Sequence, residues 1–226
     1  MTKKMKLWHL KNFNFFDCLS DEELKYVADH TTDQKIEKEQ YVFLPQNKSS
    51  IAYFLKEGKV QLGSFTKGER KIFKSVIQSG EVFGLLGLFL DETRDDFAQA
   101  LTKDVTVCYM NMEDLQFLMR KNKDLKSKIT EHIILRFGHI ERRMESLVYK
   151  NSRARIIDFL KELAEQSEEM AGTEIYINNY LTHQEFANLT WTSRQTVTAV
   201  LNDLRNKNLI YFDRKRILIR DVDELK

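Results

Sequence analysis

Short hydrophobic runs separated by turn residues fill the chain between Ile36 and Met110. Each run is rich in β-branched and aromatic residues, as strands are, and the runs recur at regular spacing. This pattern is typical of a closed or sandwiched β-roll, whose interior can hold a ligand, and not of a parallel α/β sheet. The predicted strands are Tyr41 to Leu44, Ile51 to Leu55, Val60 to Phe65, Lys71 to Ile77 and Val105 to Met110.

Helical patterns lie on both sides of this region. Trp8 to Phe16 leads into a helix that begins after Ser20, an N-cap with Glu23 three residues later, and that runs to about Asp29. A second helix is predicted from Glu113 to Lys121.

The longest helical pattern, Leu125 to Lys150, has apolar residues at spacings of three and four, close to a heptad repeat. This row of apolar residues is longer than one domain needs to cover its own surface. We therefore expect two copies of the helix to pair along it as a parallel coiled coil, with the apolar row as the seam. An ordinary amphipathic helix packed on the roll is the alternative. The expected seam residues, after Leu125, are Ile129, Ile133, Phe137, Ile140, Met144 and Leu147.

A further helix starts near Asn151 and ends in the polar stretch Glu165 to Thr173. Its inward-facing residues are Ile156, Leu160, Leu163 and Ala164. We place a domain boundary near Asn151. This divides an α+β chain into a roll domain with its N-terminal helix (1–122), the long helix (123–150) and a C-terminal domain (151–226).

The C-terminal domain contains two short helices joined by a tight turn. Thr182 caps the first helix, Thr190 and Trp191 form the turn, and the Thr192 hydroxyl caps the second helix, with Gln195 completing a capping box. This order predicts a helix-turn-helix. The buried stripe of its second helix is Val197, Val200, Leu201 and Leu204.

The opposite face of the second helix carries hydrogen-bonding side chains, clustered at the end where a recognition helix meets base edges. Arg suits guanine and Gln suits adenine, because each presents two groups at the spacing of the base edge. The residues of this face are Arg194, Gln195, Thr198, Ala199, Asn202 and Arg205.

Leu209 to Phe212 and Ile217 to Ile219 predict a two-stranded wing, and the turn between them carries Arg214, Lys215 and Arg216. Cationic side chains outnumber anionic ones across the helix-turn-helix and wing, which favours binding of a polyanion such as DNA. A structural helical hairpin with a solvated charged face is the alternative.

The composition adds limits to this picture. The chain has 226 residues, 42% of them hydrophobic, which is ample for packed cores, and a formal net charge of +2. Two cysteines, Cys18 and Cys108, supply neither a disulfide framework nor a close-spaced metal pair, which fits a reducing compartment. No leader is evident, and the longest apolar run, Val82 to Leu90, is too short to cross a bilayer. We therefore expect a cytoplasmic protein with no membrane partner.

The order of these parts resembles the Crp/Fnr family of bacterial transcription regulators, the cyclic-AMP receptor protein and its relatives. The matching segments are YVFLPQNKSSIAYFLKEGKVQL, SGEVFGLLGLF, RARIIDFLKELA and TSRQTVTAVLNDLRNKNLI. The resemblance implies an effector-sensing β-roll like a cyclic nucleotide-binding domain and a homodimer joined through the long helix. It also implies a winged helix-turn-helix on a palindromic site in double-stranded DNA, and contact with RNA polymerase.

Carried over position by position, Ser193 and Thr196 fall where the family touches phosphates. Arg194, Gln195, Thr198 and Ala199 fall where it faces bases. Many members have Glu in place of Gln195 and Arg in place of Ala199, so we expect the operator to differ from the commonest family half-site. Trp191 also replaces the small residue usual in the turn. The other residues expected to contact or position DNA are Thr182, His183, Gln184, Asn202 and Lys215.

In the cyclic-nucleotide branch, a Glu in a Gly-rich segment holds the ribose and an Arg-Ser pair holds the phosphate. Here Leu85 takes the Glu position, Arg94 aligns with the Arg, and Asp95 takes the place of Ser, with Asp96 beside it. Carboxylates repel a phosphodiester, so we expect the effector not to be cyclic AMP. The remaining candidate pocket residues are Gly84, Leu86, Gly87 and Arg136.

The segment Phe97 to Leu101, followed by Cys108, resembles the oxygen-sensing branch, in which a cysteine at this position ligates an iron–sulfur cluster. Such clusters normally take four thiolates, and only Cys18 is available besides, so we expect Cys108 to be a small buried hydrophobe. All five histidines lie outside the roll segment, which argues against haem and against a metal-dependent enzyme of cupin type. We expect no cofactor.

The leading hypothesis is thus a homodimeric, sequence-specific DNA-binding transcription regulator. A ligand-binding regulatory module without DNA affinity is the alternative, and a β-roll enzyme is disfavoured because no nucleophile and base replace the missing roll histidines.

Overall fold

The structure is a computed structural model that describes residues 13, 15–48, 50–69, 71–88, 93–165, 167, 170–178, 181–213 and 216–226, with residues 86 and 87 described by their backbone. The chain divides into two compact units, Met1–Phe137 and Gly138–Lys226. The division falls within one long helix, α4 (Lys123–Tyr149).

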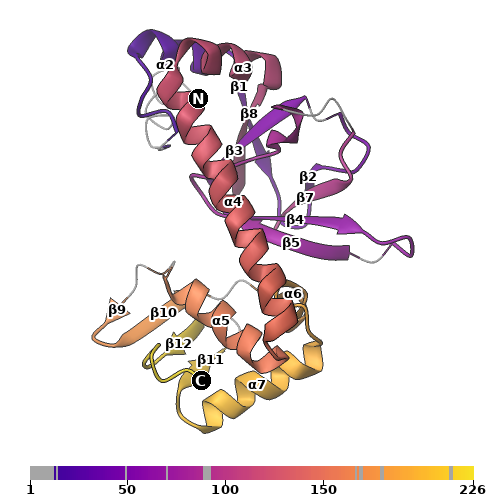
Figure 1. Cartoon of the computed structure of the whole chain (residues 1–226), viewed down its shortest axis with the longest axis vertical. Coiled ribbons are helices and arrows are strands. Elements are labelled where there is room, and N and C mark those ends of the chain that lie inside the picture. Colours follow the sequence, from indigo (N-terminus) through magenta and orange to yellow (C-terminus); the bar gives the residue numbers. More distant parts are fainter. Residues whose placement is uncertain are drawn as a thin grey trace. The chain divides into compact units, whose positions relative to one another are not determined.

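The N-terminal unit contains two four-stranded antiparallel sheets, which together form the predicted β-roll (Figure 1). One sheet has the strand order β1-β8-β3-β6 and the other has the order β2-β7-β4-β5. Between Phe83 and Asp96 the chain forms a short 3-10 helix, Leu85–Leu88. The strands are β1 (Thr31–Ile36), β2 (Tyr41–Phe43), β3 (Ile51–Glu57), β4 (Val60–Phe65), β5 (Lys71–Ile77), β6 (Val82–Phe83), β7 (Asp96–Ala100) and β8 (Val105–Asn111).

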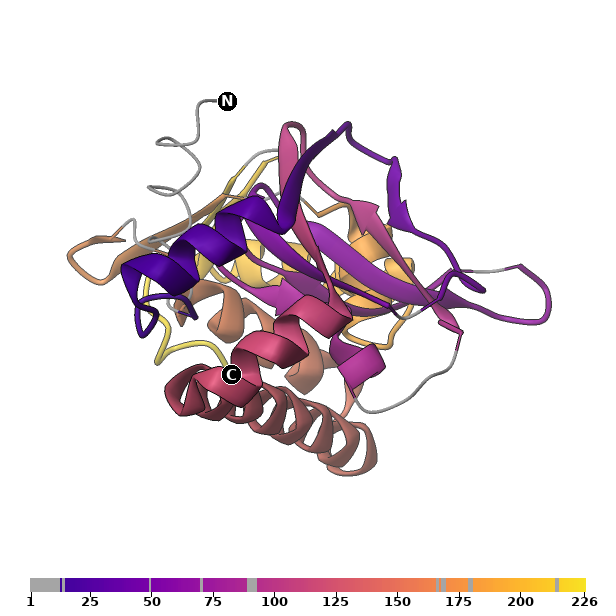
Figure 2. The same cartoon turned by 90° about the horizontal axis from the view of Figure 1, so that it is seen from above.

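Strand β3 is buried on both faces, which explains its uninterrupted hydrophobic run. Tyr53 and Leu55 point into a core that both sheets enclose. Ala52 and Phe54 point the other way, into a second core beneath the helices α2 (Asp21–Asp29), α3 (Met112–Lys121) and the first half of α4. Figure 2 shows these helices on one side of the strands of the roll.

Three strands of the roll, β1, β6 and β7, lie outside the predicted set. The sequence of β1, Thr-Thr-Asp-Gln-Lys-Ile, is mostly polar because β1 is an edge strand, and six backbone pairings with β8 hold it. Strand β7 is central but short, and Asp96 and Gln99 interrupt its apolar pattern. The predicted Ser20 capping box with Glu23 is confirmed. Most of the lead-in Trp8 to Phe16 lies outside the described residues.

The C-terminal unit contains α5 (Ser152–Glu165), α6 (His183–Leu189) and α7 (Arg194–Asn206), together with one sheet. The predicted wing strands are β11 (Ile210–Phe212) and β12 (Arg216–Ile219). The wing is not two-stranded, however, because β12 also pairs with β10 (Glu174–Asn178), which in turn pairs with β9 (Met170–Ala171). The sheet therefore has four strands, in the order β11-β12-β10-β9.

Candidate nucleic-acid interface

Both helices of the helix-turn-helix begin at a capped residue. The Thr182 hydroxyl accepts from the Glu185 N–H at 3.2 Å, and the Glu185 carboxylate accepts from the Thr182 N–H at 2.6 Å. Helix α7 is capped by Ser193, whose Oγ accepts from the Thr196 N–H at 3.0 Å. The prediction that Thr192 caps this helix, with Gln195 in a capping box, is therefore wrong by one residue.

The turn between the helices explains that shift. The Thr192 N–H donates to the Ala187 carbonyl at 2.9 Å and the Trp191 N–H to the Asn188 carbonyl at 3.4 Å, as in a Schellman motif. This motif places its central residue in the left-handed region, and the φ of Trp191 is 53°. Glycine is usual there because it has no Cβ to clash, so the Trp191 backbone is strained. Because Thr192 belongs to this motif, the next residue becomes the cap of α7.

Helix α7 has the two faces that its periodicity predicts. The predicted stripe is buried, each of its four residues being at most 8% exposed. Arg194, Gln195, Ala199 and Arg205 are exposed on the other face, and Thr198 and Asn202 are half-exposed. The predicted base-reading residues therefore share one accessible surface at the N-terminal end of the helix.

His183, the first residue of α6, lies against α7. Its Nδ1 is 2.8 Å from the Thr198 hydroxyl oxygen, and its ring centroid is 6.0 Å from that of Phe212 in β11. Burial and then the positive charge of Arg194 lower the pKa of His183 below its usual 6.5, so the imidazole is neutral at pH 7. A residue expected to position DNA thus contacts one expected to read bases.

Other residues of the helix-turn-helix and wing make contacts of their own. Gln184 donates to the Asn188 side chain at 3.0 Å, and the Arg205 guanidinium lies 5.1 Å from the Phe212 ring centroid. The wing hairpin is closed by Asp213, which exchanges two 2.9 Å hydrogen bonds with Arg216. Arg214 and Lys215, which the sequence places between the two wing strands, lie outside the described residues.

In the N-terminal unit, Arg94 lies inside the roll and is 2% exposed. Its Nη2 donates to the carbonyls of Ile51 at 2.7 Å and Gly84 at 3.0 Å, and its guanidinium lies 4.4 Å from the Phe43 ring centroid. Its Nη1 and the Oδ1 of Asp96 are buried without a hydrogen-bond partner among the described residues. Burial lowers the pKa of Arg94, although the guanidinium stays charged.

The other expected pocket residues lie in different surroundings. Asp95 is exposed, and Leu85 packs partly against the helix-covered core. Arg136 of α4 donates to the Ser75 hydroxyl of β5 at 3.3 Å, so it does reach the roll. The side chain of Leu86 lies outside the described part of the chain, and Gly87 is described by its backbone.

Two family models match these two units. A cyclic nucleotide-binding domain matches residues 33–122, and a Crp-like helix-turn-helix domain matches residues 154–226. The chain belongs to the Crp/Fnr family of transcription regulators. It is accordingly a DNA-binding regulator with an effector-binding domain, and not an enzyme.

Similar proteins include other regulators of this family. The global nitrogen regulator of Nostoc sp. is 26% identical over 187 residues, which are 82% of this chain and 84% of that protein. The anaerobic regulatory protein of Bacillus subtilis is 23% identical over 211 residues, 93% of this chain and 89% of that protein. The structure of FixK2 from Bradyrhizobium japonicum has the same fold, with a TM-score of 0.76 at 18% identity, over 86% of this chain and 95% of that one.

The long helix of this Crp/Fnr regulator changes its surroundings along its length. Leu125 and Ile129 are buried in the core of the N-terminal unit, and Ile133 packs partly against it. Ile129 therefore offers no surface to a partner, contrary to its expected place in the seam. Further along, the helix carries large exposed hydrophobic residues, which are Ile134, Leu135, Phe137, Ile140, Met144, Val148 and Tyr149.

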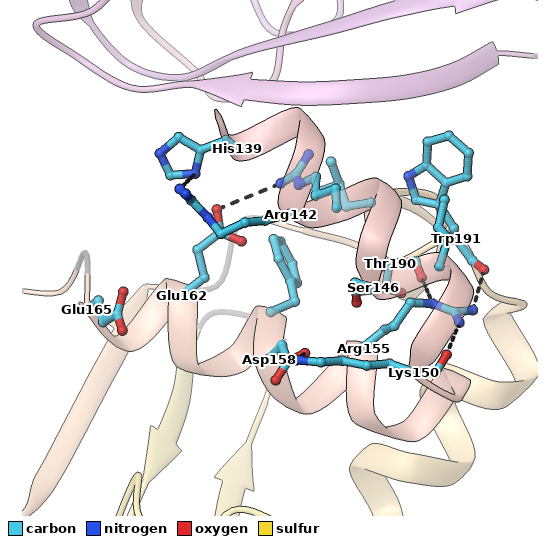
Figure 3. A pocket seen from close by; sticks show the side chains of 14 residues that line it. His139, Arg142, Ser146, Lys150, Arg155, Asp158, Glu162, Glu165, Thr190 and Trp191 are labelled. Atoms are coloured by element: carbon cyan, nitrogen blue, oxygen red, sulfur yellow. Dashed lines mark hydrogen bonds and ion pairs between the residues drawn. The ribbon is translucent and has the colours of Figure 1, made fainter. Parts of the chain in front are cut away.

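The regulator also has a pocket of about 330 Å³ inside its C-terminal unit, between the second half of α4, α5 and the helix-turn-helix turn (Figure 3). Arg155 of α5 lines it. This guanidinium donates to the carbonyls of Lys150 at 2.7 Å, Thr190 at 3.0 Å and Trp191 at 3.0 Å. It therefore joins the end of α4 to the turn of the helix-turn-helix. Sequence reasoning missed Arg155, because only the apolar positions of α5 carry a periodic signal.

The cysteines of the regulator lie in unlike environments. Cys108 is fully buried in the core, and burial raises its pKa to about 11, so its thiol stays protonated. Cys18 is half-exposed. Within the described residues, no three His, Cys, Asp or Glu side chains gather as metal ligands. No helix in the described part of the chain has the length and apolar character that a membrane span requires.

Proposed function

We propose that this Crp/Fnr protein is a homodimeric, sequence-specific regulator that places the N-terminal end of α7 in the major groove of a palindromic DNA site. The observation that carries this proposal is the exposed face of α7, where Arg194, Gln195 and Ala199 lie at the capped end of a helix buried on its other side. Arg and Gln each fit a particular base edge, whereas Ala199 offers only a methyl group.

The exposed hydrophobic residues of α4 support the dimer. Phe137, Ile140, Met144 and Val148 lie along one face of the helix at spacings of three and four, and they are 54–75% exposed. Such a stripe stays in water unless another surface covers it, and a two-fold related copy of the same helix buries both stripes at once. The two copies of the helix-turn-helix then face two half-sites about one helical turn of DNA apart. The family resemblance implies RNA polymerase as a further partner.

The dimer is tested by sedimentation. We expect the wild-type chain to sediment as a dimer and Met144→Glu as a monomer, because a carboxylate would be placed in the seam. Leu135→Glu is the matched control, since Leu135 is 57% exposed but lies off the stripe. A wild-type monomer, or an unaltered dimer in Met144→Glu, would contradict the proposed seam.

We also propose that the effector is not cyclic AMP. The Arg94 Nη2 is already bound to two backbone carbonyls, Leu85 stands in the place of a ribose-binding Glu, and the carboxylate of Asp96 lies close by in the sequence. Isothermal calorimetry with cyclic AMP tests this, and no saturable binding at micromolar concentrations is expected. Saturable binding that Arg94→Lys abolishes would overturn this part of the proposal.

Selection of bound sites from random duplex DNA tests the DNA-binding proposal. We expect two inverted half-sites with centres about 10 base pairs apart, bound with an affinity that falls steeply as salt rises. Arg194→Ala should weaken binding by about 1–3 kcal/mol and relax the choice of one base pair, whereas Lys215→Ala should weaken all sequences alike. Equal binding of selected and scrambled duplexes would contradict this proposal. It would favour the alternative, a ligand-binding module without sequence-specific DNA recognition.

A further inference from the structure

The hydroxyl group of Thr198 is held by two partners within the protein. It donates to the carbonyl of Arg194, one turn earlier in α7, at 2.9 Å, and it lies 2.8 Å from Nδ1 of His183. The first contact ties the oxygen to its own helix, and the second ties it to α6. The side chain of Thr198 therefore has a fixed orientation at the centre of the exposed face of α7.

The hydrogen of this hydroxyl is used within the protein. A threonine hydroxyl has one hydrogen, and its acceptors are the Arg194 carbonyl and, in the tautomer with unprotonated Nδ1, the His183 ring. When Nδ1 carries the proton of the neutral ring, the hydrogen goes to the carbonyl, and Nδ1–H donates to the hydroxyl oxygen. In either tautomer the oxygen has no hydrogen to offer DNA.

Besides a free lone pair of this oxygen, Thr198 has its Cγ2 methyl left for DNA. Among the base edges of the major groove, only thymine presents a methyl group, and a threonine methyl is an apolar group that packs against it. We propose that Thr198 selects thymine through methyl contact, and that His183 is the positioning residue that holds it in this orientation. This inference rests on the proposed function, because it assumes that this face of α7 enters the major groove.

Replacement of thymine by deoxyuridine tests the methyl contact, because it removes only the C5 methyl. Each thymine of the selected half-site is replaced in turn, and the dissociation constant is measured for the wild-type protein, Thr198→Val and Thr198→Ser. We expect one position at which deoxyuridine weakens wild-type binding about three- to fivefold, in line with one buried methyl group. Thr198→Val keeps its methyl groups and should keep this sensitivity, whereas Thr198→Ser should lose it.

The role of His183 is tested by the ratio of the dissociation constants for the thymine and deoxyuridine duplexes. His183→Ala frees the hydroxyl of Thr198 and should bring the thymine-to-deoxyuridine ratio close to one, and His183→Asn, whose amide can donate in place of Nδ1–H, should restore it. Any direct contact of His183 with phosphate would change the affinity for both duplexes equally, so it would leave the ratio unaltered.

Two results would overturn the inference. One is wild-type binding to the selected site with no thymine at which deoxyuridine matters. The other is sensitivity that Thr198→Ser keeps and Thr198→Val loses, which would show that the hydroxyl is the reading group. In both cases the wild-type protein still binds its selected site, so the proposed function stands. Absence of sequence-specific binding by the wild-type protein would instead refute the proposed function itself.

Discussion

Arg155 satisfies carbonyl groups at the ends of two helices, and its removal is expected to destabilise the C-terminal unit. Its guanidinium donates to the carbonyl of Lys150, next to the end of α4, and to those of Thr190 and Trp191, in the turn after α6 (Figure 3). Carbonyls at helix C-termini have no partner within the helix, so they must find one elsewhere. In Arg155→Met the apolar stem is kept and these three partners are lost.

The size of the effect follows from the contacts. A hydrogen bond to a charged group contributes about 1.5–3 kcal/mol, and an ordinary one about 1 kcal/mol. Arg155 is half-buried, so water can reach some of the released carbonyls, and the lower figure applies. Three carbonyl bonds then predict a loss of about 3 kcal/mol in the free energy of unfolding of this unit. Arg155→Lys should lose about half as much, because an ammonium group cannot reach all three carbonyls at once.

Urea denaturation followed by tryptophan fluorescence measures this loss. The chain has two tryptophans, so a Trp8→Phe background leaves Trp191, beside Arg155, as the reporter. With an m-value of about 1–3 kcal/mol per M, we expect Arg155→Met to lower the transition midpoint by about 1–3 M.

Arg142→Met is the matched control. Arg142 is exposed, it lines the same pocket, and it contacts the His139 ring at 3.2 Å. Its replacement should change stability by less than about 0.5 kcal/mol. Equal midpoints for Arg155→Met and Arg142→Met would refute the reasoning, since the three carbonyl bonds would then contribute nothing measurable.

Three further substitutions test other parts of the structure. A methyl group at Gly63 would lie 2.5 Å from the Phe97 ring, so Gly63→Ala should lower the thermal midpoint and cost about 2–3 kcal/mol. A methyl group at Gly68 would meet only Thr66 Oγ1, at an ordinary contact distance of 3.9 Å, so Gly68→Ala should cost almost nothing. Asn208, which follows the C-terminal cap of α7, has a φ of 61°. Asn208→Val should therefore cost about 1–2 kcal/mol in urea denaturation, while Asn208→Gly should be tolerated; equal effects would argue against strain. Burial, and then the charge of Arg136, lower the pKa of His132, so its neutral form stabilises the fold above about pH 6.5. That contribution should be lost as the pH falls through the lowered pKa, which makes the wild-type unfolding free energy fall more steeply on acidification than that of His132→Gln.

Local sequence patterns were sufficient for much of the fold. The bounds of β4 and β5 match the predicted runs Val60 to Phe65 and Lys71 to Ile77, because alternation and turn residues mark these strands within the segment itself. The buried stripe of α7 was equally readable, since helical spacing decides which residues share a face. The same spacing marked the exposed residues Arg194 and Gln195 as candidates for DNA contact.

The tertiary structure decided what depends on distant partners. The polar strand β1 exists because β8 pairs with it, and β10 joins the wing sheet because β12 has a second free edge. Periodicity gives no signal for such pairing, since the two strands are separated by many residues.

The same holds at the candidate interface. The first residue of α7 depends on the hydrogen bonds of the preceding turn, and the orientation of Thr198 depends on His183 in another helix. A polar side chain can be placed on a face from its sequence position alone. Which of its atoms stays free for DNA is settled by the partners that folding brings to it, because a hydrogen bond already made inside the protein removes that donor or acceptor from recognition.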